Sequence, residues 1–365
     1  MSNDLYVAAG GGGDALAALM LCRALGGSNS APTVASYSWD RYLIDPAPGP
    51  RQVQDFVGLR QLTEHAWEVT ADSNLAAGGV SGLTVLARHT PARFMVMDPA
   101  RGAAGLRQQL REVIDHLSVD RVTLVDVGGD VAAHGSEASL LSPLGDALAL
   151  AATAELPVPT DVAVIGPGLD GELPDDELRN ALVAMGADVR KLRIAHVRPF
   201  LPALEHHPSE ATMLVAAAAM GASGRAEIRD KGALVSLTDH STDAFLTSSD
   251  SVLERNAIAQ KLIATESFDQ AEAITREICG RTELDHERRK SEMLAHRRTG
   301  DPSAEELRSR LREYREAAAA RGADFVSFRR LTEVLGLHRY DPTRMRALVG
   351  DLAFHELPLC RISLR

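Results

Sequence analysis

Glycines and acidic residues recur where short apolar runs end, and these are the residue types best suited to chemistry. Glycine- or acid-containing segments follow five such runs, at residues 10–14, 40–41, 98, 126–130 and 170–172. If the runs are parallel strands, their carboxyl ends share one edge of a sheet, which is where ligands bind in open α/β folds. We therefore expect these segments to line one site.

Four consecutive glycines, Gly10, Gly11, Gly12 and Gly13, follow the first run. Glycine loses more backbone entropy on folding than other residues, so the run needs a physical reason. One reason is a ligand close to the backbone, and the N-terminus of a following helix favours an anion such as phosphate. The alternative is a tight turn packed against a neighbouring helix, which needs only one or two glycines. We expect the turn to bind the phosphate of ATP or of another nucleotide cofactor.

Asp14 places a carboxylate beside that expected anion, where it would repel phosphate unless a cation lay between them. Mg²⁺ is typically held by one or two carboxylates and phosphate oxygens, so we expect Asp14 and Asp130 to bind Mg²⁺. The turn Gly128-Gly129 lets Asp126 and Asp130 approach the site, and it is expected to contact the cofactor. Alternatively, Asp14 is a favourable first-turn residue, Asp130 caps the next segment and Asp126 accepts backbone hydrogen bonds.

Catalysis and substrate binding are assigned to the same strand ends and to the loops after them. The expected catalytic residues are Asp14, Asp126, Asp130 and Glu137. The expected substrate-binding residues are Asp40, Arg41, Arg51, Ser142, Asp146, Asp170, Glu172 and Glu210. A guanidinium can bind a carboxylate or phosphate through two hydrogen bonds. Adjacent histidines rarely bind one metal ion, so His206 and His207 are expected at the surface.

Alternating strands and helices must position these residues. Strands are expected at 5–9, 33–38, 94–97, 122–127 and 162–165, with weaker β-like stretches at 65–70 and 83–87 and further strands at 234–237 and 244–247. Helices are expected at 14–25, 105–117, 143–154 and 209–220, with two more inside 250–280. Strands about 30 residues apart with helices between them predict an α/β fold. We expect a doubly wound, mostly parallel sheet in a Rossmann-like, three-layer arrangement.

The last part of the chain differs in charge from the rest. Residues 281–365 carry 18 Lys and Arg against 14 Asp and Glu, whereas residues 1–280 carry 21 against 36. Glu and Arg at helical spacing in 282–322 predict a solvated helix pair, and 325–357 predict a small helical unit. We expect an α/β ligand-binding or catalytic domain over 1–280 and a charged helical extension over 281–365. That extension is a candidate surface for a protein partner or for a second copy of the chain.

Composition excludes several classes of protein. A net charge of −11 and an aromatic content of 4% argue against a nucleic-acid partner, which needs basic residues and exposed rings. No apolar run reaches membrane-spanning length, no signal peptide begins the chain, and three dispersed cysteines imply neither a disulfide framework nor a zinc site. We expect a cytoplasmic protein with a small-molecule substrate and no membrane partner.

Short motifs narrow the chemistry further. None of the four lysines lies near the glycine run at residues 10–13 or completes a G-x-x-x-x-G-K-[ST] loop, so Walker-type ATPase chemistry is not supported, and no G-x-S-x-G elbow is present. Gly10, Gly12 and Ala15 fit a dinucleotide fingerprint, with Asp40 as a ribose-binding acid, but almost any glycine template fits a glycine run.

Five motifs together resemble a family catalogued as domain of unknown function 1152, found in bacteria and archaea. They are GGGGD (10–14), the WDR to DPxPGPR loop (39–51), DVGGD (126–130), the GSE and SPLGD segment (135–146) and GPGLDGEL (166–173). The resemblance covers about the first 280 residues and implies a shared site with no known activity. The segment Gly10–Ala15 also resembles the pyrophosphatase loop of adenylate-forming enzymes, which implies pyrophosphate binding with Mg²⁺ on Asp14, although both serines of that loop are missing.

Three functional hypotheses follow. The first is an enzyme that uses ATP and Mg²⁺ to activate a small carboxylate for transfer to an amine, as a ligase does. The second is a metal-assisted hydrolase or lyase acting on a sugar or nucleoside, in which the acids bind hydroxyls or activate water. The third is an NAD-binding oxidoreductase or a non-catalytic ligand-binding protein.

Overall fold

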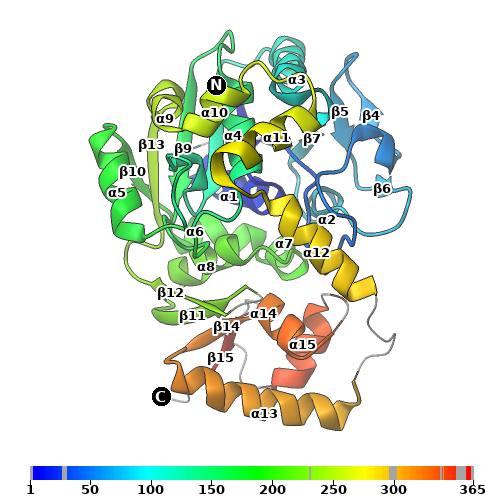
Figure 1. Cartoon of the computed structure of the whole chain (residues 1–365), viewed down its shortest axis with the longest axis vertical. Helices are drawn as coiled ribbons and strands as arrows, with labels where there is room; N and C mark the ends of the chain where they lie inside the picture. The colour runs from blue at the N-terminus through cyan, green and yellow to red at the C-terminus, as the bar shows by residue number, and fades with distance from the viewer. Residues whose placement is uncertain are drawn as a thin grey trace.

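The computed structural model of the chain describes residues 3–26, 31–229, 232–295, 302–337, 339, 341–350 and 359–362. A nine-stranded, mostly parallel sheet forms its centre (Figure 1). In spatial order its strands are β10 (Asp188–Lys191), β13 (Asp243–Ser248), β9 (Thr160–Ile165), β8 (Arg121–Val127), β1 (Asp4–Ala8), β2 (Thr33–Ser36), β7 (Arg93–Val96), β5 (Trp67–Val69) and β4 (Arg60–Gln61). A separate ribbon pairs β3 (Phe56–Val57) with β6 (Asn74–Leu75).

The five middle strands are parallel, and antiparallel strands extend the sheet at both ends. The chain begins in the middle at β1, builds outward through β2 and β7, and returns to the other side of β1 with β8 and β9. The order of strands therefore reverses direction between β1 and β8. In open α/β sheets, the crevice outside the carboxyl ends of the strands at such a point is where ligands bind.

Alternate side chains of each strand enter two hydrophobic cores, one on each face of the sheet. In β1, Tyr6 and Ala8 pack into one core, and Leu5 and Val7 pack into the other. The first core is covered by α1 (Gly12–Ala24), α2 (Gly82–His89), α6 (Ile194–Val197), α7 (Leu201–His206) and α8 (Glu210–Ala219). The second is covered by α3 (Gly102–Leu117), α4 (Pro143–Thr153), α5 (Asp175–Ala184), α9 (Ser249–Arg255), α10 (Ala257–Leu262) and α11 (Phe268–Cys279).

A smaller four-stranded sheet lies next to α8 (Figure 1). Its order is β12 (Ala233–Leu237), β11 (Gly224–Ile228), β14 (Phe325–Ser327) and β15 (Leu359–Arg361). One face of this sheet joins the core of α1 and α8, and the other packs against α13 (Ala304–Ala320), α14 (Phe328–Val334) and α15 (Pro342–Val349). The helix α12 (Glu283–Ala295) runs from the main body toward this unit. The small sheet thus takes two strands from before residue 281 and two from after it.

Three local expectations need correction. Residues 83–87 belong to the helix α2 rather than to a strand, because Leu83 and Leu86 lie one turn apart on its buried side. The segment 250–280 holds three helices, since α9 ends at Asn256, whose side chain caps the start of α10. The C-terminal unit is not purely helical, because residues 325–327 pair with β11 and β15. Residues 351–358 of the predicted 325–357 unit lie outside the described part of the chain.

Among the residues that the structure describes, no helix combines the length and the apolar character needed to cross a membrane.

Candidate functional site

A cavity lies at the carboxyl ends of the central strands, beside the point where the strand order reverses. The volume of this cavity is about 120 Å³. Its walls come from the β1–α1 turn, the segments after β2, β8 and β9, the first turns of α4 and α8, the β11–β12 turn, α12 and α14. Of the predicted site residues, it brings together Gly10, Gly12, Gly13, Asp14, Asp40, Arg41, Asp126, Asp130, Ser142, Asp146, Asp170 and Glu210.

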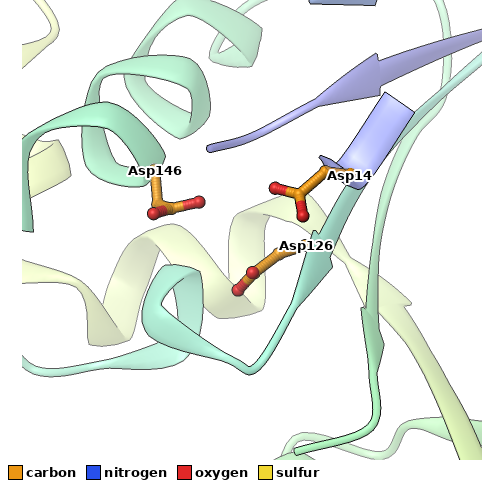
Figure 2. Close-up of side chains that lie close together, drawn as sticks. All are labelled: Asp14, Asp126 and Asp146. Atoms are coloured by element: carbon orange, nitrogen blue, oxygen red, sulfur yellow. The ribbon is translucent and has the colours of Figure 1, made fainter. Parts of the chain in front are cut away.

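Three aspartates meet at the bottom of this cavity, and we call them the first acidic group. They are Asp14 in the first turn of α1, Asp126 at the end of β8 and Asp146 in the first turn of α4. One carboxylate oxygen of each lies within 4.8 Å of the others. Figure 2 shows the three carboxyl groups pointing toward one another. The parallel strands bring together residues that are more than a hundred positions apart in the sequence.

Backbone donors orient two of these carboxylates. Gly10 donates its N–H to Asp14 Oδ2 at 2.7 Å, and Val131 donates to Asp126 Oδ2 at 3.0 Å. Asp146 Oδ1 is buried and has no hydrogen-bond partner among the described residues. A buried polar atom without a partner is unfavourable, so this oxygen is suited to receive a ligand.

The first acidic group has no ion-pair partner, although the charge of Arg41 acts on Asp14. Asp126 and Asp146 are only 3% and 7% exposed, and none of the three aspartates forms an ion pair in the described part of the chain. Burial raises the pKa of Asp14 to about 7. Burial and then the neighbouring carboxylates raise the pKa values of Asp126 and Asp146 well above the ordinary range.

A second acidic group, Asp130, Asp170 and Glu172, lies next to the first, with oxygens also within 4.8 Å of one another. This group has its own cation. Arg229 Nη2 lies 2.6 Å from Glu172 Oε1 and 3.7 Å from Asp170 Oδ2. Glu172 also accepts hydrogen bonds from the backbone N–H of Leu141 at 2.5 Å, and from the hydroxyl of Ser142.

The pKa values of the second group reflect this pairing. Burial raises the pKa of Glu172, but Arg229 and the hydrogen bonds outweigh burial and hold it below its usual range. Burial and then Glu172 raise the pKa of Asp170 to about 6, against the opposing effect of Arg229. The pKa of Asp130 is raised further by burial and by its acidic neighbours. Asp14 and Asp130, the predicted Mg²⁺ ligands, therefore fall into different groups.

The glycine turn is packed closely by the protein itself. Gly11 has a φ of 126°, and a Cβ there would lie 3.0 Å from the carbonyl oxygen of Trp39. A Cβ on Gly12 would lie 2.7 Å from His207 Nε2, and one on Gly13 would lie 2.3 Å from the hydroxyl of Ser209. These contacts favour the packing alternative for the glycine run. Gly128 and Gly129, with φ of 122° and 111°, likewise form a turn against Asp170 and Leu178.

Three predicted residues have other partners outside the cavity wall. The guanidinium of Arg51 pairs with Asp45. Glu137 accepts hydrogen bonds from the backbone N–H groups of His134 and Gly135 at 2.7 and 2.8 Å, so it caps its own loop. Glu172 is held by Arg229 behind the cavity wall.

The expectation of a surface position is wrong for His207, which is 4% exposed and lines the cavity. His206 is exposed and stacks on His89 with ring centroids 4.5 Å apart. The sequence signal that could have predicted this buried position is the place of His207 just before Pro208 and a strongly apolar helix. The residues that begin a buried helix lie at the edge of the core.

The α12 helix also adds acids that were expected to be solvated. Glu283 accepts hydrogen bonds from the N–H groups of Leu144 and Gly145 at the start of α4, the latter at 2.7 Å. Glu287 accepts from Trp39 Nε1 at 2.9 Å. The two glutamates are four positions apart and so share one helical face, and buried Leu284 beside them marks the side that faces the core.

Two arginines complete the wall from the small sheet and its helices. Arg229 follows β11, and Arg329 in α14 pairs with Glu210 at 3.0 Å. Alternating residues around a glycine-containing turn in 224–237 could have predicted the hairpin that carries Arg229.

A family model described as "Protein of unknown function (DUF1152)" matches residues 5–291. The chain belongs to the DUF1152 family. The matched part includes both acidic groups and the α12 glutamates Glu283 and Glu287, whereas Arg329 lies beyond it. No curated protein and no solved structure matches the chain.

Proposed function

We propose that this chain is a divalent-cation-dependent hydrolase or lyase that acts on a small hydroxylated molecule such as a sugar or nucleoside. The metal ion, Mg²⁺ in the proposal, is held by Asp14, Asp126 and Asp146. The observation that carries the proposal is the meeting of three carboxylates within 4.8 Å, those of buried Asp126 and Asp146 and of half-buried Asp14, without an ion-pair partner among the described residues.

The donor set fits a hard cation. Mg²⁺ prefers carboxylate and water oxygens in octahedral geometry, and the first acidic group supplies carboxylate oxygens only. Burying like charges together is unfavourable, and a divalent ion removes that repulsion. The unpartnered Asp146 Oδ1 further supports a ligand at this position.

When bound, such an ion lowers the pKa of a coordinated water and so supplies a nucleophile at neutral pH. The residues of the chain orient the metal-binding carboxylates and the substrate. Gly10 and Val131 hold Asp14 and Asp126 through their N–H groups. Asp130 Oδ1 is buried without a partner in the described part of the chain, and it is placed to accept a hydrogen bond from a substrate hydroxyl.

This function is favoured over ATP-dependent ligation by the charge balance at the first acidic group. Three carboxylates exceed the charge of one divalent ion, so phosphate oxygens placed directly on that ion would still be repelled. The glycine turn is also covered by Trp39, His207 and Ser209. The order of the five parallel strands is that of Rossmann-type sheets. A Rossmann-like three-layer arrangement is therefore part of the proposal, with a small polar ligand in place of a dinucleotide.

Metal binding tests the proposal first. Isothermal titration of the full chain with Mn²⁺, a probe for Mg²⁺, should show one ion bound per chain. Asp146→Asn should weaken that binding about 100-fold, which corresponds to about 2.7 kcal/mol. Asp72→Asn is the matched control, because Asp72 is exposed and outside the cavity. Equal Mn²⁺ affinity in wild type and Asp146→Asn would contradict the assignment.

Turnover tests the reaction class. A panel of nucleosides, sugar phosphates and nucleoside monophosphates, incubated without ATP, should yield a free base or sugar in a reaction that EDTA stops. Consumption of ATP to AMP or ADP with a carboxylate and an amine present, and no product without ATP, would instead establish the ligase.

A further inference from the structure

Two hydrogen-bond donors line the same cavity as the first acidic group and have no acceptor. Arg41 lies at the cavity wall, and its guanidinium forms no hydrogen bond or ion pair with any described residue. His207 is buried, and its Nε2 has no hydrogen-bond partner in the described part of the chain. The other two guanidiniums of the wall are already neutralised, Arg229 by Glu172 at 2.6 Å and Arg329 by Glu210 at 3.0 Å.

The hydrogen bonding of His207 determines which ring nitrogen carries the proton. The backbone N–H of Ser209 donates to His207 Nδ1 at 3.2 Å, so Nδ1 is an acceptor. Burial and then the charge of Arg41 lower the pKa of His207 to about 4, so the ring is neutral at pH 7. A neutral imidazole whose Nδ1 accepts must carry its proton on Nε2. His207 therefore presents an N–H donor to the cavity.

The same hydrogen bond disfavours His207 as a metal ligand. A histidine that binds a metal through one nitrogen almost always donates a hydrogen bond from the other. Here the other nitrogen accepts instead. The missing partner of Nε2 is consequently an acceptor atom of a ligand rather than a cation.

Asp40 is the nearest acidic side chain to consider as an internal acceptor. Its Oδ1 and His207 Nε2 lie 2.4 and 2.6 Å from the point where a Cβ on Gly82 would stand. However, Asp40 forms no hydrogen bond or ion pair with His207, and its Oδ2 accepts from Gly82 N–H at 2.9 Å and from the hydroxyl of Ser38 at 3.2 Å. Asp40 therefore leaves the His207 donor unsatisfied.

We propose that Arg41 and His207 form a subsite for the phosphate group of the substrate, which makes that substrate a sugar phosphate or a nucleoside monophosphate. Arg41 supplies a charged, two-pronged donor and His207 a neutral one, a combination suited to phosphate oxygens. Burial and then the charges of Arg329 and Arg229 lower the pKa of Arg41, whereas Glu287 and Glu210 raise it. The substrate would place its hydroxyls at the acidic groups and its phosphate at this subsite. The inference rests on the proposed function only in naming the ligand as the substrate.

The test uses inorganic phosphate as the probe, titrated into the metal-free full chain in EDTA. Wild type should bind phosphate, and both Arg41→Gln and His207→Phe should weaken binding about ten-fold or more, as expected for lost hydrogen bonds to a charged group. The matched controls are Arg190→Gln, at an exposed arginine on the edge strand β10, and His206→Phe, at the exposed neighbouring histidine. Both controls should bind phosphate as wild type does.

A second readout follows the donor itself. In ¹⁵N NMR of the imidazole rings, His207 should show the Nε2–H form, and its Nε2 resonance should shift on addition of phosphate but not of acetate. If His207→Phe does not fold, Arg41→Gln and this resonance still decide the question, because Arg41 is exposed to the cavity.

Three results would overturn the subsite: no phosphate binding by wild type, equal binding by Arg41→Gln, or an Nε2 resonance that responds to acetate alone. These results do not bear on the metal proposal, because no metal is present in this titration. Conversely, Arg41→Gln should retain Mn²⁺ binding, so loss of the phosphate site is distinguishable from loss of the metal site.

Discussion

The two acidic groups lie next to each other at the cavity, with Glu172 outside the cavity wall, and the charges of the two groups are balanced differently. Each places three carboxylates within 4.8 Å. The group of Asp130, Asp170 and Glu172 contains an arginine of the same chain, Arg229, paired with Glu172 at 2.6 Å. The group of Asp14, Asp126 and Asp146 has no such arginine in the described part of the chain, and burial holds the pKa of Asp14 near 7.

The difference shows which carboxylates are structural and which are available. Acids that an internal guanidinium neutralises connect the small sheet to the main body, because Arg229 follows β11. Acids that remain uncompensated raise the free energy of the metal-free protein and favour binding of an external cation. The proposed metal site is therefore chosen by the absence of an internal partner and not by the presence of acids alone.

The largest expected effect comes from removing the internal cation. Arg229→Met should lower the free energy of unfolding by about 3–5 kcal/mol, because Glu172 would be left buried without its partner. Urea unfolding in EDTA measures this, with Arg190→Met as control. Millimolar Mg²⁺ should restore part of the loss, since the second group would then resemble the first. If Arg229→Met unfolds in EDTA with the same free energy as the wild type, then Arg229 does not neutralise this group.

A pH effect of on the order of 2 kcal/mol is expected at Asp40. Burial raises its pKa to about 7, against the hydrogen bond from Gly82, while Asp45 raises it and Arg41 lowers it. Between about pH 4 and pH 7 the folded state holds a proton that the unfolded state has released. Stability from this group is thus present at acid pH and lost as the pH rises through 7.

Asp40→Asn should accordingly reduce the fall in unfolding free energy between pH 4.5 and pH 8, measured by urea titration in EDTA. Asp72→Asn, at an exposed position, should leave that fall unchanged. An unaltered pH profile in Asp40→Asn would place the pKa of this carboxyl in its ordinary range.

Opposite signs are expected when one acid of each group is neutralised. Asp126→Asn should stabilise the metal-free protein by about 1 kcal/mol, because it removes repulsion within an uncompensated group. Glu172→Gln should destabilise it, because Arg229 would lose its main partner. Thermal unfolding of both variants in EDTA makes the comparison, and shifts of the same sign would remove the distinction between the two groups.

The order of strand ends in the sequence was enough to predict much of this site. Asp14, Asp126, Asp130 and Asp170 each follow or end a predicted strand, and parallel pairing places all of them at the cavity. The strand and helix pattern also predicted the large, mostly parallel sheet. These are local signals, in which the position of a residue in its element determines where it lies in the fold.

The missed residues depend on contacts between distant segments. Arg229 reaches the site because β11 pairs with β14, about a hundred positions later, and no local pattern specifies that pairing. The α12 glutamates have the spacing of a solvated helix, and only the packing of Leu284 turns them inward. The grouping of Asp14 with Asp146 rather than with Asp130 depends on where α4 begins relative to β1.

The smallest expected effect is at Glu283, a half-buried acid whose carboxylate is bound by a helix N-terminus instead of a cation. Its carboxylate accepts from Leu144 and Gly145, and burial raises its pKa to about 7 despite these bonds. Glu283→Gln keeps an acceptor there, so thermal unfolding should change by less than about 1 kcal/mol. A loss above about 2 kcal/mol would show that the negative charge itself holds α12 on α4.

The position of a bound ion tests the central claim most directly. Crystals of the full chain soaked in Mn²⁺ should give one anomalous difference peak among the carboxylates of Asp14, Asp126 and Asp146, with Asp146 Oδ1 as a ligand. A peak among Asp130, Asp170 and Glu172, or no peak at an Mn²⁺ concentration that saturates the titration, would contradict the account.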